Sequence, residues 1–278
     1  MITQLTCNGL TIGTFDSGYI FSRLSGFDSP TVRINVKENG NYHGARYGSA
    51  YYGARVISIE GEIWGDDADD YEAKRRALGQ AFTILNGLQR VTFTTRSGLV
   101  VKADCIVNNR LEMPYEKGDV VKGDFRLELI APFPFFLSQT KYTQSVYVFE
   151  GGGGEIPAEI PFTFGGGDSG NVDINNLGNV EAYPIIRIYG NITDPTIRNN
   201  TSGLQLSINA TLADDTEYIE LDVYRRTAKR ENGTNILADV TGDWWTLKTG
   251  INNVVLSATA YGEGARAEVI YEYHYLGL

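Results

Sequence analysis

The chain has 278 residues, and its 24 Lys and Arg against 34 Asp and Glu give a formal net charge of -10. This acidic balance argues against a protein that binds nucleic acid through the phosphate backbone, because such a protein needs a basic face. The two cysteines, Cys7 and Cys105, cannot make a disulfide framework, and two histidines are too few for most zinc or triad sites. The length fits two modest domains or one large one.

The sequence contains no apolar run long enough to cross a membrane. Met1–Gly13 also lacks the basic and apolar segments of a signal peptide. We therefore expect a protein that is made in the cytoplasm of a cell, stays there unless it leaves as part of something larger, and is not inserted into a membrane. The 32 glycines, 17 tyrosines and 12 phenylalanines favour many short strands joined by tight turns.

Most of the first half alternates between apolar and polar residues. The clearest run is 57–63, where the isoleucines fall on one side and serine and glutamate on the other. The runs 32–36, 91–94 and 125–129 follow the same rule. A period of two predicts half-buried strands in a largely antiparallel sheet.

One segment has a helical period instead. Over residues 68–86, the apolar side chains Tyr71, Leu78, Phe82 and Leu85 fall on one helical face. Carboxylates gather where the helix would begin, and the dipole favours them there (Asp66, Asp67, Asp69 and Asp70). We predict the only long helix of the protein here, with Asn86-Gly87 at its end. The aspartates are interpreted as dipole partners, since the pattern of a calcium loop is absent.

Two prolines within 132–134 exclude a helix and a central strand, and the first unit is expected to close there. We predict an N-terminal domain over 1–137 and a C-terminal domain over 138–278, with a glycine-rich connecting region at about 150–178. From residue 182 onward, short strands recur without helices, which is typical of a β-sandwich. The first domain carries 15 basic and 16 acidic residues and the second 9 and 18, so we expect them to face different surroundings.

Two motifs suggest chemistry, and each has a simpler interpretation. Gly165–Gly170 matches the G-x-G-x-x-G fingerprint, but no helix is predicted after it to receive a pyrophosphate, so we interpret it as a flexible loop. Glu220 and Asp222 project from one face of a predicted strand, as paired carboxylates do in some glycosidases. The simpler interpretation is the solvated face of a strand whose other face is buried.

Trp244 and Trp245, with the tyrosines at 271, 273 and 275, are candidates for a platform on which a sugar ring stacks. Adjacent tryptophans on a strand point to opposite faces, so we expect one of them to anchor the core. His43 and His274 are interpreted as ordinary surface or sheet residues. Because no nucleophile, base and acid can be combined with any specificity, we predict no catalytic residues, no cofactor and no metal.

Several segments share their order and spacing with a known family. In the first unit they are the strand 55–63, the helix with Tyr71, Arg75 and Leu78, and the closing run 125–134. In the second unit they are 176–190, 193–199, 219–222, Asn232-Gly233 and 247–252. Over nearly the whole chain, this succession resembles the distal tail protein (Dit) family of long-tailed, siphovirus-type bacteriophages.

The resemblance implies a mainly β protein. Its N-terminal, ring-forming domain would be β-sandwich-like with one α-helix, and a galectin-like antiparallel β-sandwich would follow. It also implies a structural virion protein at the tail tip, in the baseplate hub, which forms a homo-hexameric ring with a channel for DNA. The ring would contact the tail-tube protein above and the tail-tip hub protein below. The family has no catalytic residues to carry over and no specific nucleic-acid site.

The run 39–53 is rich in glycine and tyrosine, and we expect it to form an extended arm or hairpin. An arm of this composition buries little surface by itself. We therefore expect its tyrosines to pack on a neighbouring subunit (Tyr42, Tyr47, Tyr51 and Tyr52). Deletion of residues 40–52 should then leave folded monomers.

Two alternative functions remain open. As a carbohydrate-binding module, the sandwich would recognise a host-surface glycan through Trp244 and Trp245. As a weaker third hypothesis, Glu220 and Asp222 would hydrolyse such a glycan. The state of assembly separates the ring-forming protein from both alternatives.

Overall fold

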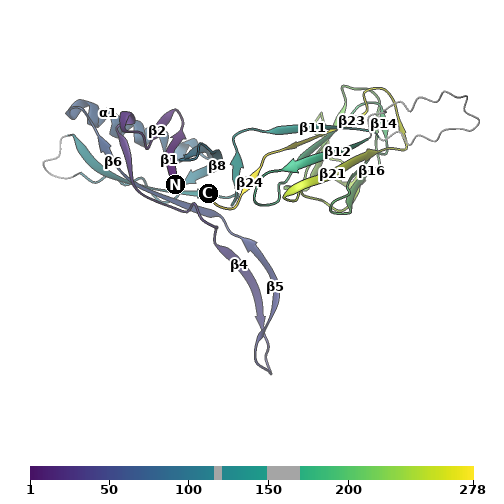
Figure 1. Ribbon diagram of the computed structural model, residues 1–278, viewed down its shortest axis with the longest axis horizontal. Coiled ribbons are helices and arrows are strands. Elements are labelled where there is room, and N and C mark those ends of the chain that lie inside the picture. The colour runs from purple at the N-terminus through teal and green to yellow at the C-terminus, as the bar shows by residue number, and fades with distance from the viewer. Residues whose placement is uncertain (116–120, 149–169) are drawn as a thin grey trace, which may run out of the picture. The chain divides into compact units, whose positions relative to one another are not determined.

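The computed structural model describes residues 1–115, 121–148 and 170–278 (Figure 1). Its contacts divide the chain into two compact units. Unit 1 consists of Met1–Gln139 together with Tyr275–Leu278, and unit 2 of Thr140–His274. This differs from the division at 137/138 that we expected, because Tyr275–Leu278 return to unit 1. Within the described ranges, no helix has the length and apolar character needed to span a membrane.

Unit 1 is built on one large antiparallel sheet with the strand order β2-β1-β7-β8-β9-β6-β3. The strands are β1 (Ile2–Cys7), β2 (Leu10–Ile12), β3 (Tyr19–Ser25), β6 (Arg55–Trp64), β7 (Gln89–Thr95), β8 (Val100–Val107) and β9 (Lys122–Ala131), and β10 (Phe136–Ser138) pairs with β8. The backbone N–H of Gly13 donates to the carbonyl of Tyr19 (2.9 Å), so the two ends of this order meet and the sheet nearly closes. As the alternation predicts, Ile57, Ile59 and Ile63 of β6 are fully buried.

The helix α1 (Ala68–Ala81) is the one α-helix of the described residues, and it begins where the aspartates predict. Asp67 is its N-cap, and the carboxylate accepts a hydrogen bond from the backbone N–H of Asp70 (2.8 Å). The side chain of Asp70 also pairs with Lys74 (2.7 Å), one turn further along. The mainly β fold with a single long helix, predicted from the sequence, is confirmed.

The end of the helix differs from the prediction. It lies at Ala81 rather than at residue 86, and a separate 3-10 turn, η2 (Ile84–Asn86), follows. Phe82 is buried as predicted, but the break after it places the side chain of Leu85 in solvent, where it is 91% exposed. A continuous helix would have kept Phe82 and Leu85 on one face.

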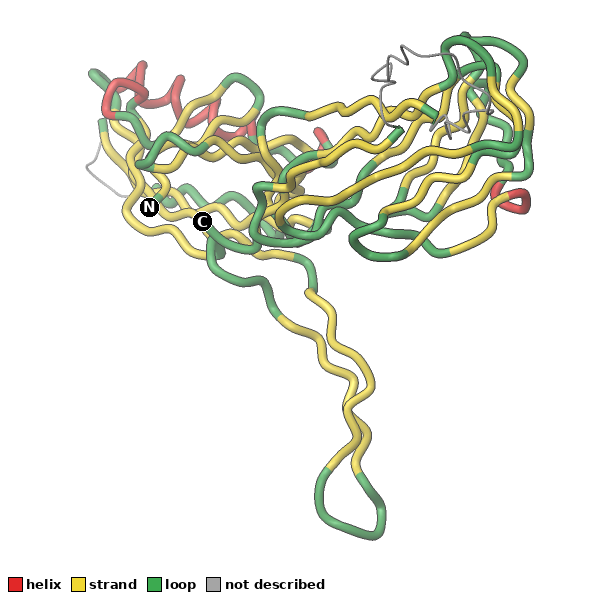
Figure 2. The backbone as a smooth tube through the Cα atoms, turned by 45° about the vertical axis from the view of Figure 1, so that its right-hand side comes forward, coloured by secondary structure: helices red, strands yellow, loops and turns green. Residues whose placement is uncertain are grey.

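Strands β4 (Val32–Glu38) and β5 (Ala45–Tyr52) form a separate two-stranded sheet. Figures 1 and 2 show this hairpin as a long ribbon that projects from unit 1. Every residue of β4 is exposed, whereas the alternation at 32–36 predicted a half-buried strand. The strand is therefore predicted correctly and its burial wrongly, because the described residues of unit 1 cover neither of its faces.

Arg55 joins several segments of unit 1 below the hairpin. Its side chain is 1% exposed, and its guanidinium donates to four backbone carbonyls (Gly26 and Asp28, both 2.6 Å, Pro134, 2.8 Å, and Leu276). The same group lies 4.2 Å from the centre of the Phe136 ring. Burial lowers the pKa of Arg55 to about 10, so the guanidinium is charged at neutral pH. A buried cation of this kind is tolerated because backbone carbonyls accept hydrogen bonds from its N–H groups.

Unit 2 is an antiparallel β-sandwich. One sheet has the order β11-β23-β13-β18-β19 and the other β12-β21-β15-β16-β20. The first comprises β11 (Tyr142–Tyr147), β13 (Ile185–Tyr189), β18 (Tyr218–Asp222), β19 (Thr227–Arg230) and β23 (Arg266–Tyr271). The second comprises β12 (Asn171–Asn176), β15 (Thr196–Asn199), β16 (Leu204–Ile208), β20 (Val240–Gly242) and β21 (Gly250–Ser257).

Short elements complete the described chain. They are β14 (Ile192–Thr193), β17 (Thr211–Leu212) and β22 (Ala260–Tyr261), which form a small sheet, β24 (His274–Tyr275), and the 3-10 turns η1 (Phe15–Ser17) and η3 (Leu237–Asp239). Of the glycine-rich region expected at about 150–178, the described part begins at Gly170 and contains β12. Residues 149–169, with all of the Gly165–Gly170 motif except its last glycine, lie outside the described residues.

Candidate functional site

The hairpin β4–β5 has one apolar and one basic face. Directly opposite residues of an antiparallel pair share a face, and the register sets Val32 against Tyr52, Ile34 against Ala50 and Val36 against Tyr47. The other face pairs Arg33 with Tyr51 and Lys37 with Arg46. Val32, Ile34 and Val36 are 51%, 59% and 52% exposed, respectively. An exposed apolar face on a β-branched strand is the kind of surface that marks a contact site for another chain.

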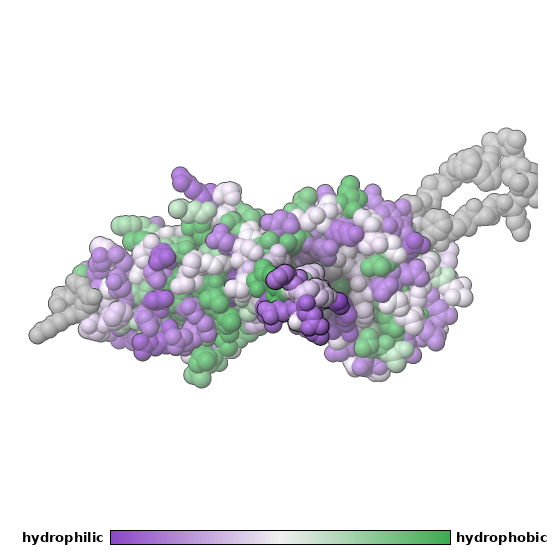
Figure 3. Space-filling model, turned by 90° about the horizontal axis from the view of Figure 1, so that it is seen from below, coloured by the Kyte–Doolittle hydropathy of each residue, from purple (hydrophilic) through white to green (hydrophobic). Residues whose placement is uncertain are grey.

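The four tyrosines predicted to form an arm all belong to this hairpin or its tip. Tyr47 and Tyr52 lie on the apolar face, Tyr51 lies on the basic face, and Tyr42 accepts a hydrogen bond from Arg46 (3.0 Å) near the tip. All four side chains are exposed. In Figure 3 the hairpin points toward the viewer, and its tip is mainly hydrophilic. The apolar surface of the arm therefore lies along its strands and not at its tip.

The base of the hairpin is held firmly. The backbone N–H of Gly53 donates to the carbonyl of Thr31 (2.7 Å), which closes the hairpin where it leaves unit 1. The ring of Tyr52 packs edge-on against Phe135, with 5.7 Å between ring centres. Arg55 follows two residues after Gly53 and binds the carbonyls of Gly26 and Asp28, on the segment that enters the hairpin. Both legs of the hairpin are thus tied to the same part of unit 1.

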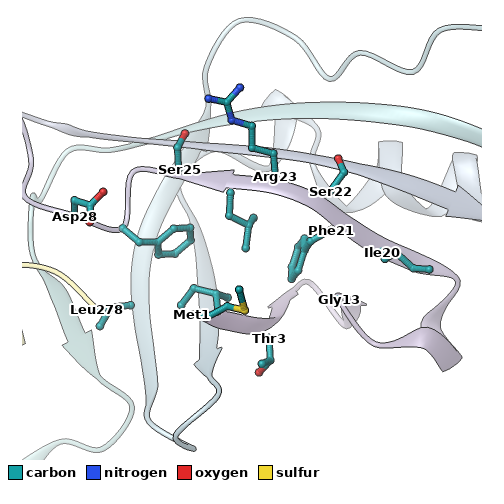
Figure 4. A pocket seen from close by; sticks show the side chains of 13 residues that line it. Met1, Thr3, Gly13, Ile20, Phe21, Ser22, Arg23, Ser25, Asp28 and Leu278 are labelled. Atoms are coloured by element: carbon teal, nitrogen blue, oxygen red, sulfur yellow. The ribbon is translucent and has the colours of Figure 1, made fainter.

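A groove of about 580 Å³ lies where the sheet of unit 1 fails to close completely, between β1 and β3 (Figure 4). Strand β3 pairs only with β6, and the start of β1 lies beyond the stretch that β2 pairs with, so strand edges border the groove. In Figure 4, Phe21 points from β3 toward Met1 and toward Thr3 of β1, while Ser22 and Arg23 point to the other side. Further lining comes from Ile2, Ile20, Leu24, Phe27 and Leu278.

The glycine at the margin of this groove permits a close approach of the chain. Gly13 has a φ of +104°, and a side chain there would meet the ring of Phe21 at 2.3 Å and the carbonyl of Thr3 at 2.4 Å. A larger residue at this position would displace Phe21 and narrow the groove.

Trp244 and Trp245 do not form a two-ring platform. Trp245 is 1% exposed, lies in the core of unit 2, and has a buried indole N–H without a hydrogen-bond partner in the described residues. Trp244 packs partly against the same core. The tyrosine ladder is also turned inward: Tyr271 is buried, and Tyr273 stacks on Tyr142 with 4.4 Å between ring centres. Of the two tryptophans only Trp244 remains partly accessible, and Tyr273 and Tyr275 are half-buried.

The carboxylates and histidines of unit 2 have structural partners. Glu220 pairs with Arg187 across the sheet (2.9 Å), and Asp222 pairs with Arg225 (3.0 Å). Because each carboxylate is engaged by its own arginine, the two are not arranged as an acid and a nucleophile. His274 is buried, and its Nδ1 donates to the carbonyl of Glu181 (2.9 Å).

Metal and thiol chemistry find no support in the described part of the chain. Within those residues, His, Cys, Asp and Glu nowhere gather in a group of three or more that would hold a metal ion. Burial raises the pKa of Cys7 to about 11 and that of Cys105 to about 12, so both thiols are protonated and unreactive at neutral pH.

The residues that sequence reasoning missed are the groove side chains and the apolar face of β4. The alternation of Val32, Ile34 and Val36 was visible, but it carries no information about what covers the apolar side. Phe21, Leu24 and Phe27 do not follow a period of two, because a bulge lies between Phe21 and Arg23. One side of the groove is formed by β1. This strand is close to β2 and β3 in the sequence, but it faces β3 only because the sheet curves.

Comparisons with known proteins agree with this architecture. Residues 9–131 match the model of the phage tail protein RIFT-related domain. Among solved structures, the Dit protein of phage SPP1, described as a paradigm of the hub adsorption apparatus in phages that infect Gram-positive bacteria, matches with a TM-score of 0.67 and 13% identity. The match covers 98% of each chain.

A chain of the phage P2 baseplate in its activated conformation with calcium matches with a TM-score of 0.50 and 11% identity, again over 98% of each chain. A search of curated proteins gives no significant match. At these identities the solved structures establish the fold, and the family model assigns the domain that lies within unit 1. Residues 9–131 thus match the phage tail protein RIFT-related domain, and the chain shares its fold with the Dit protein of phage SPP1.

Proposed function

We propose that this protein is a structural, non-enzymatic component of the phage tail tip that assembles as a hexameric ring. Unit 1 forms the wall of the ring, DNA leaves through its channel, and the ring joins the tail tube above to the tip hub below. Unit 2 is the outward sandwich. The carrying observation is the hairpin β4–β5, whose apolar face (Val32, Ile34 and Val36) the described residues of the chain leave uncovered.

The charges of the two units support this arrangement. Unit 1 holds 15 of the basic and 16 of the acidic residues, a nearly neutral balance past which DNA can move without being held. Unit 2 holds the remaining 9 basic and 18 acidic residues, which suits a solvated position at the outside of the ring. Neither balance favours a specific nucleic-acid site.

In this proposal the hairpin, including Tyr42, Tyr47, Tyr51 and Tyr52, is the arm between subunits. Replacement of residues 32–52 by a pair of glycines removes the arm without opening unit 1, because Thr31 and Gly53 are already hydrogen-bonded across the gap. Native mass spectrometry should give a six-fold mass for the intact chain and a folded monomer for the deletion variant. Rings of unchanged mass in the variant would contradict the role of the arm.

The glycan-binding alternative remains a separate prediction, and it now depends on Trp244 alone. A glycan array with the wild-type chain and Trp244→Ala tests it. Unchanged binding in the variant would remove Trp244 from the interaction, and no binding by either chain would remove the alternative.

A further inference from the structure

We propose that the apolar face of the hairpin of one copy packs into the groove between β1 and β3 of the next copy. This inference rests on the ring proposed above. It identifies the two surfaces that meet at each interface between subunits, namely the apolar face of the hairpin and the groove.

The two surfaces both present apolar side chains. The hairpin presents β-branched and aromatic side chains in a row on a projecting ribbon (Val32, Ile34, Val36, Tyr47 and Tyr52). The apolar side chains that line the groove come chiefly from β1 and β3 (Ile2, Ile20, Phe21, Leu24 and Phe27), and polar residues line it as well (Thr3, Ser22, Arg23, Ser25 and Asp28). Removal of both surfaces from water in one contact is favourable in proportion to the apolar area covered.

The occupant has to come from another copy, because a chain cannot seat its own hairpin in its own groove. Both legs of the hairpin are fixed at their base by the hydrogen bond from Gly53 to Thr31. Arg55 holds the entering segment through the carbonyls of Gly26 and Asp28. With its base fixed in this way, the hairpin leads away from unit 1, and its strands cannot fold back over β3, only a few residues before Thr31.

The charges also favour this partner. Residues 32–52 carry Arg33, Lys37 and Arg46 against Glu38, a net charge of about +2 at neutral pH. The rest of unit 1 carries three more acidic than basic residues. A second copy of unit 1 therefore attracts the hairpin, with a range limited to roughly 10 Å at ordinary salt.

Because the hairpin and the groove are different surfaces of one chain, their pairing between copies is a head-to-tail contact. Such a heterologous contact does not close as a symmetric dimer; it continues from copy to copy and ends only when the rotation closes a ring. The pairing of hairpin and groove is thus the kind of contact that a ring requires.

Disulfide trapping tests this pairing. Ile34→Cys lies at the middle of the hairpin face and Leu24→Cys in the groove, and the chain with both substitutions is oxidised mildly. The native Cys7 and Cys105 do not interfere because they are buried. The matched control carries Ile34→Cys with Leu88→Cys, a second apolar residue of unit 1 that is exposed and does not line the groove. All variants are first checked for folding by circular dichroism.

We expect oxidation to join the Ile34→Cys/Leu24→Cys chains into a ladder of covalent oligomers on a non-reducing gel. The joined fraction should exceed that of the control pair by about ten-fold or more, because contact raises the effective concentration of the thiols. Native mass spectrometry of the same samples separates the possible failures. A six-fold mass without the ladder, or with a ladder in the control pair instead, would support the hexameric ring and contradict the packing of the hairpin in the groove. Monomers without the ladder would contradict both the hexameric ring and the pairing of hairpin and groove.

Discussion

Strands β4 and β6 lie on either side of β5 in the chain and share one sequence pattern, yet they end in opposite environments. Both alternate β-branched apolar residues with polar ones. In β6 the isoleucines are fully buried between neighbouring strands, whereas in β4 Ile34 is 59% exposed. The comparison teaches that alternation determines which side of a strand is apolar and leaves open which chain covers it. The apolar side of β6 is buried by unit 1 itself, and we infer that the apolar side of β4 is buried by a second copy of the chain.

The largest effect is expected at Arg55, the first residue of β6. Arg55→Met keeps much of the side-chain volume but leaves four backbone carbonyls without their donor, and should cost unit 1 about 4 kcal/mol. In Arg55→Lys, three N–H donors cannot satisfy four carbonyls. This variant should therefore destabilise unit 1, but by less than Arg55→Met does. Hydrogen exchange of β6 peptides measures the loss. Peptides of β21 in unit 2 serve as the internal control and should not change.

A matched pair of isoleucines tests the comparison directly. Ile59→Ala empties a buried site and should destabilise unit 1 by about 3 kcal/mol, while Ile34→Ala should change the monomer by less than about 0.5 kcal/mol. Urea unfolding of dilute samples, shown to be monomers by mass, measures both. Ile34→Ala should instead weaken the ring. A large loss of monomer stability in Ile34→Ala would show that the hairpin is covered within its own chain.

The two histidines repeat the contrast, since His43 lies in the exposed tip of the hairpin and His274 is buried in unit 2. Burial lowers the pKa of His274 to about 4, against about 6.5 in an unfolded chain. Between these values the unfolded chain binds a proton that the folded chain does not. The unfolding free energy of unit 2 is therefore unaffected above about pH 6.5 and falls by about 3 kcal/mol toward pH 4.

In a Trp64→Phe background, Trp244 and Trp245 report on unit 2 alone, and urea titrations by fluorescence at several pH values measure this slope. His274→Gln should flatten it, and His43→Gln should leave it unchanged. An equal slope in wild type and His274→Gln would assign the acid sensitivity to other groups.

The smallest effect is expected from a matched pair of glycines. A Cβ at Gly61 of β6 would lie 2.4 Å from the carbonyl of Ile20 and 2.6 Å from the Phe125 ring, so Gly61→Ala should cost about 2 kcal/mol. At Gly48 of β5 the nearest atom is the carbonyl of Asn35 at 3.2 Å, and Gly48→Ala should stay within about 0.5 kcal/mol. Thermal unfolding measures both. Similar melting temperatures for the two variants would contradict the tight packing of β3 on β6.

Local rules explain how much of this fold the sequence predicts. The strand at 57–63 and the start of the helix follow from alternation and from the capping by Asp67, which depend on neighbours in the chain. Burial of one of the two adjacent tryptophans also follows from strand geometry, and Trp245 is the buried one. The end of the helix at Ala81 and the exposure of Leu85 do not, because the packing of Phe82 decides them.

The candidate site was less predictable than the fold. The tyrosine-rich arm was expected as a hairpin, and it extends back to Val32, through residues interpreted as part of a half-buried sheet. The groove depends on the bulge in β3 and on the return of Leu278 to unit 1, neither of which leaves a local signal. The distal tail protein resemblance supplied the expectation of assembly, and the exposed face of β4 now gives it a physical basis.

The contact between Arg55 and the carbonyl of Leu276 also bears on how the protein is made. The two segments of unit 1 are synthesised at different times, because all of unit 2 is translated before Tyr275–Leu278. Until then Arg55 lacks one of its acceptors, and the margin of the groove beside Leu278 is missing. Chains whose translation stops within unit 2 consequently lack this margin of the groove, so in the ring proposed above an unfinished chain would offer the next copy an incomplete surface.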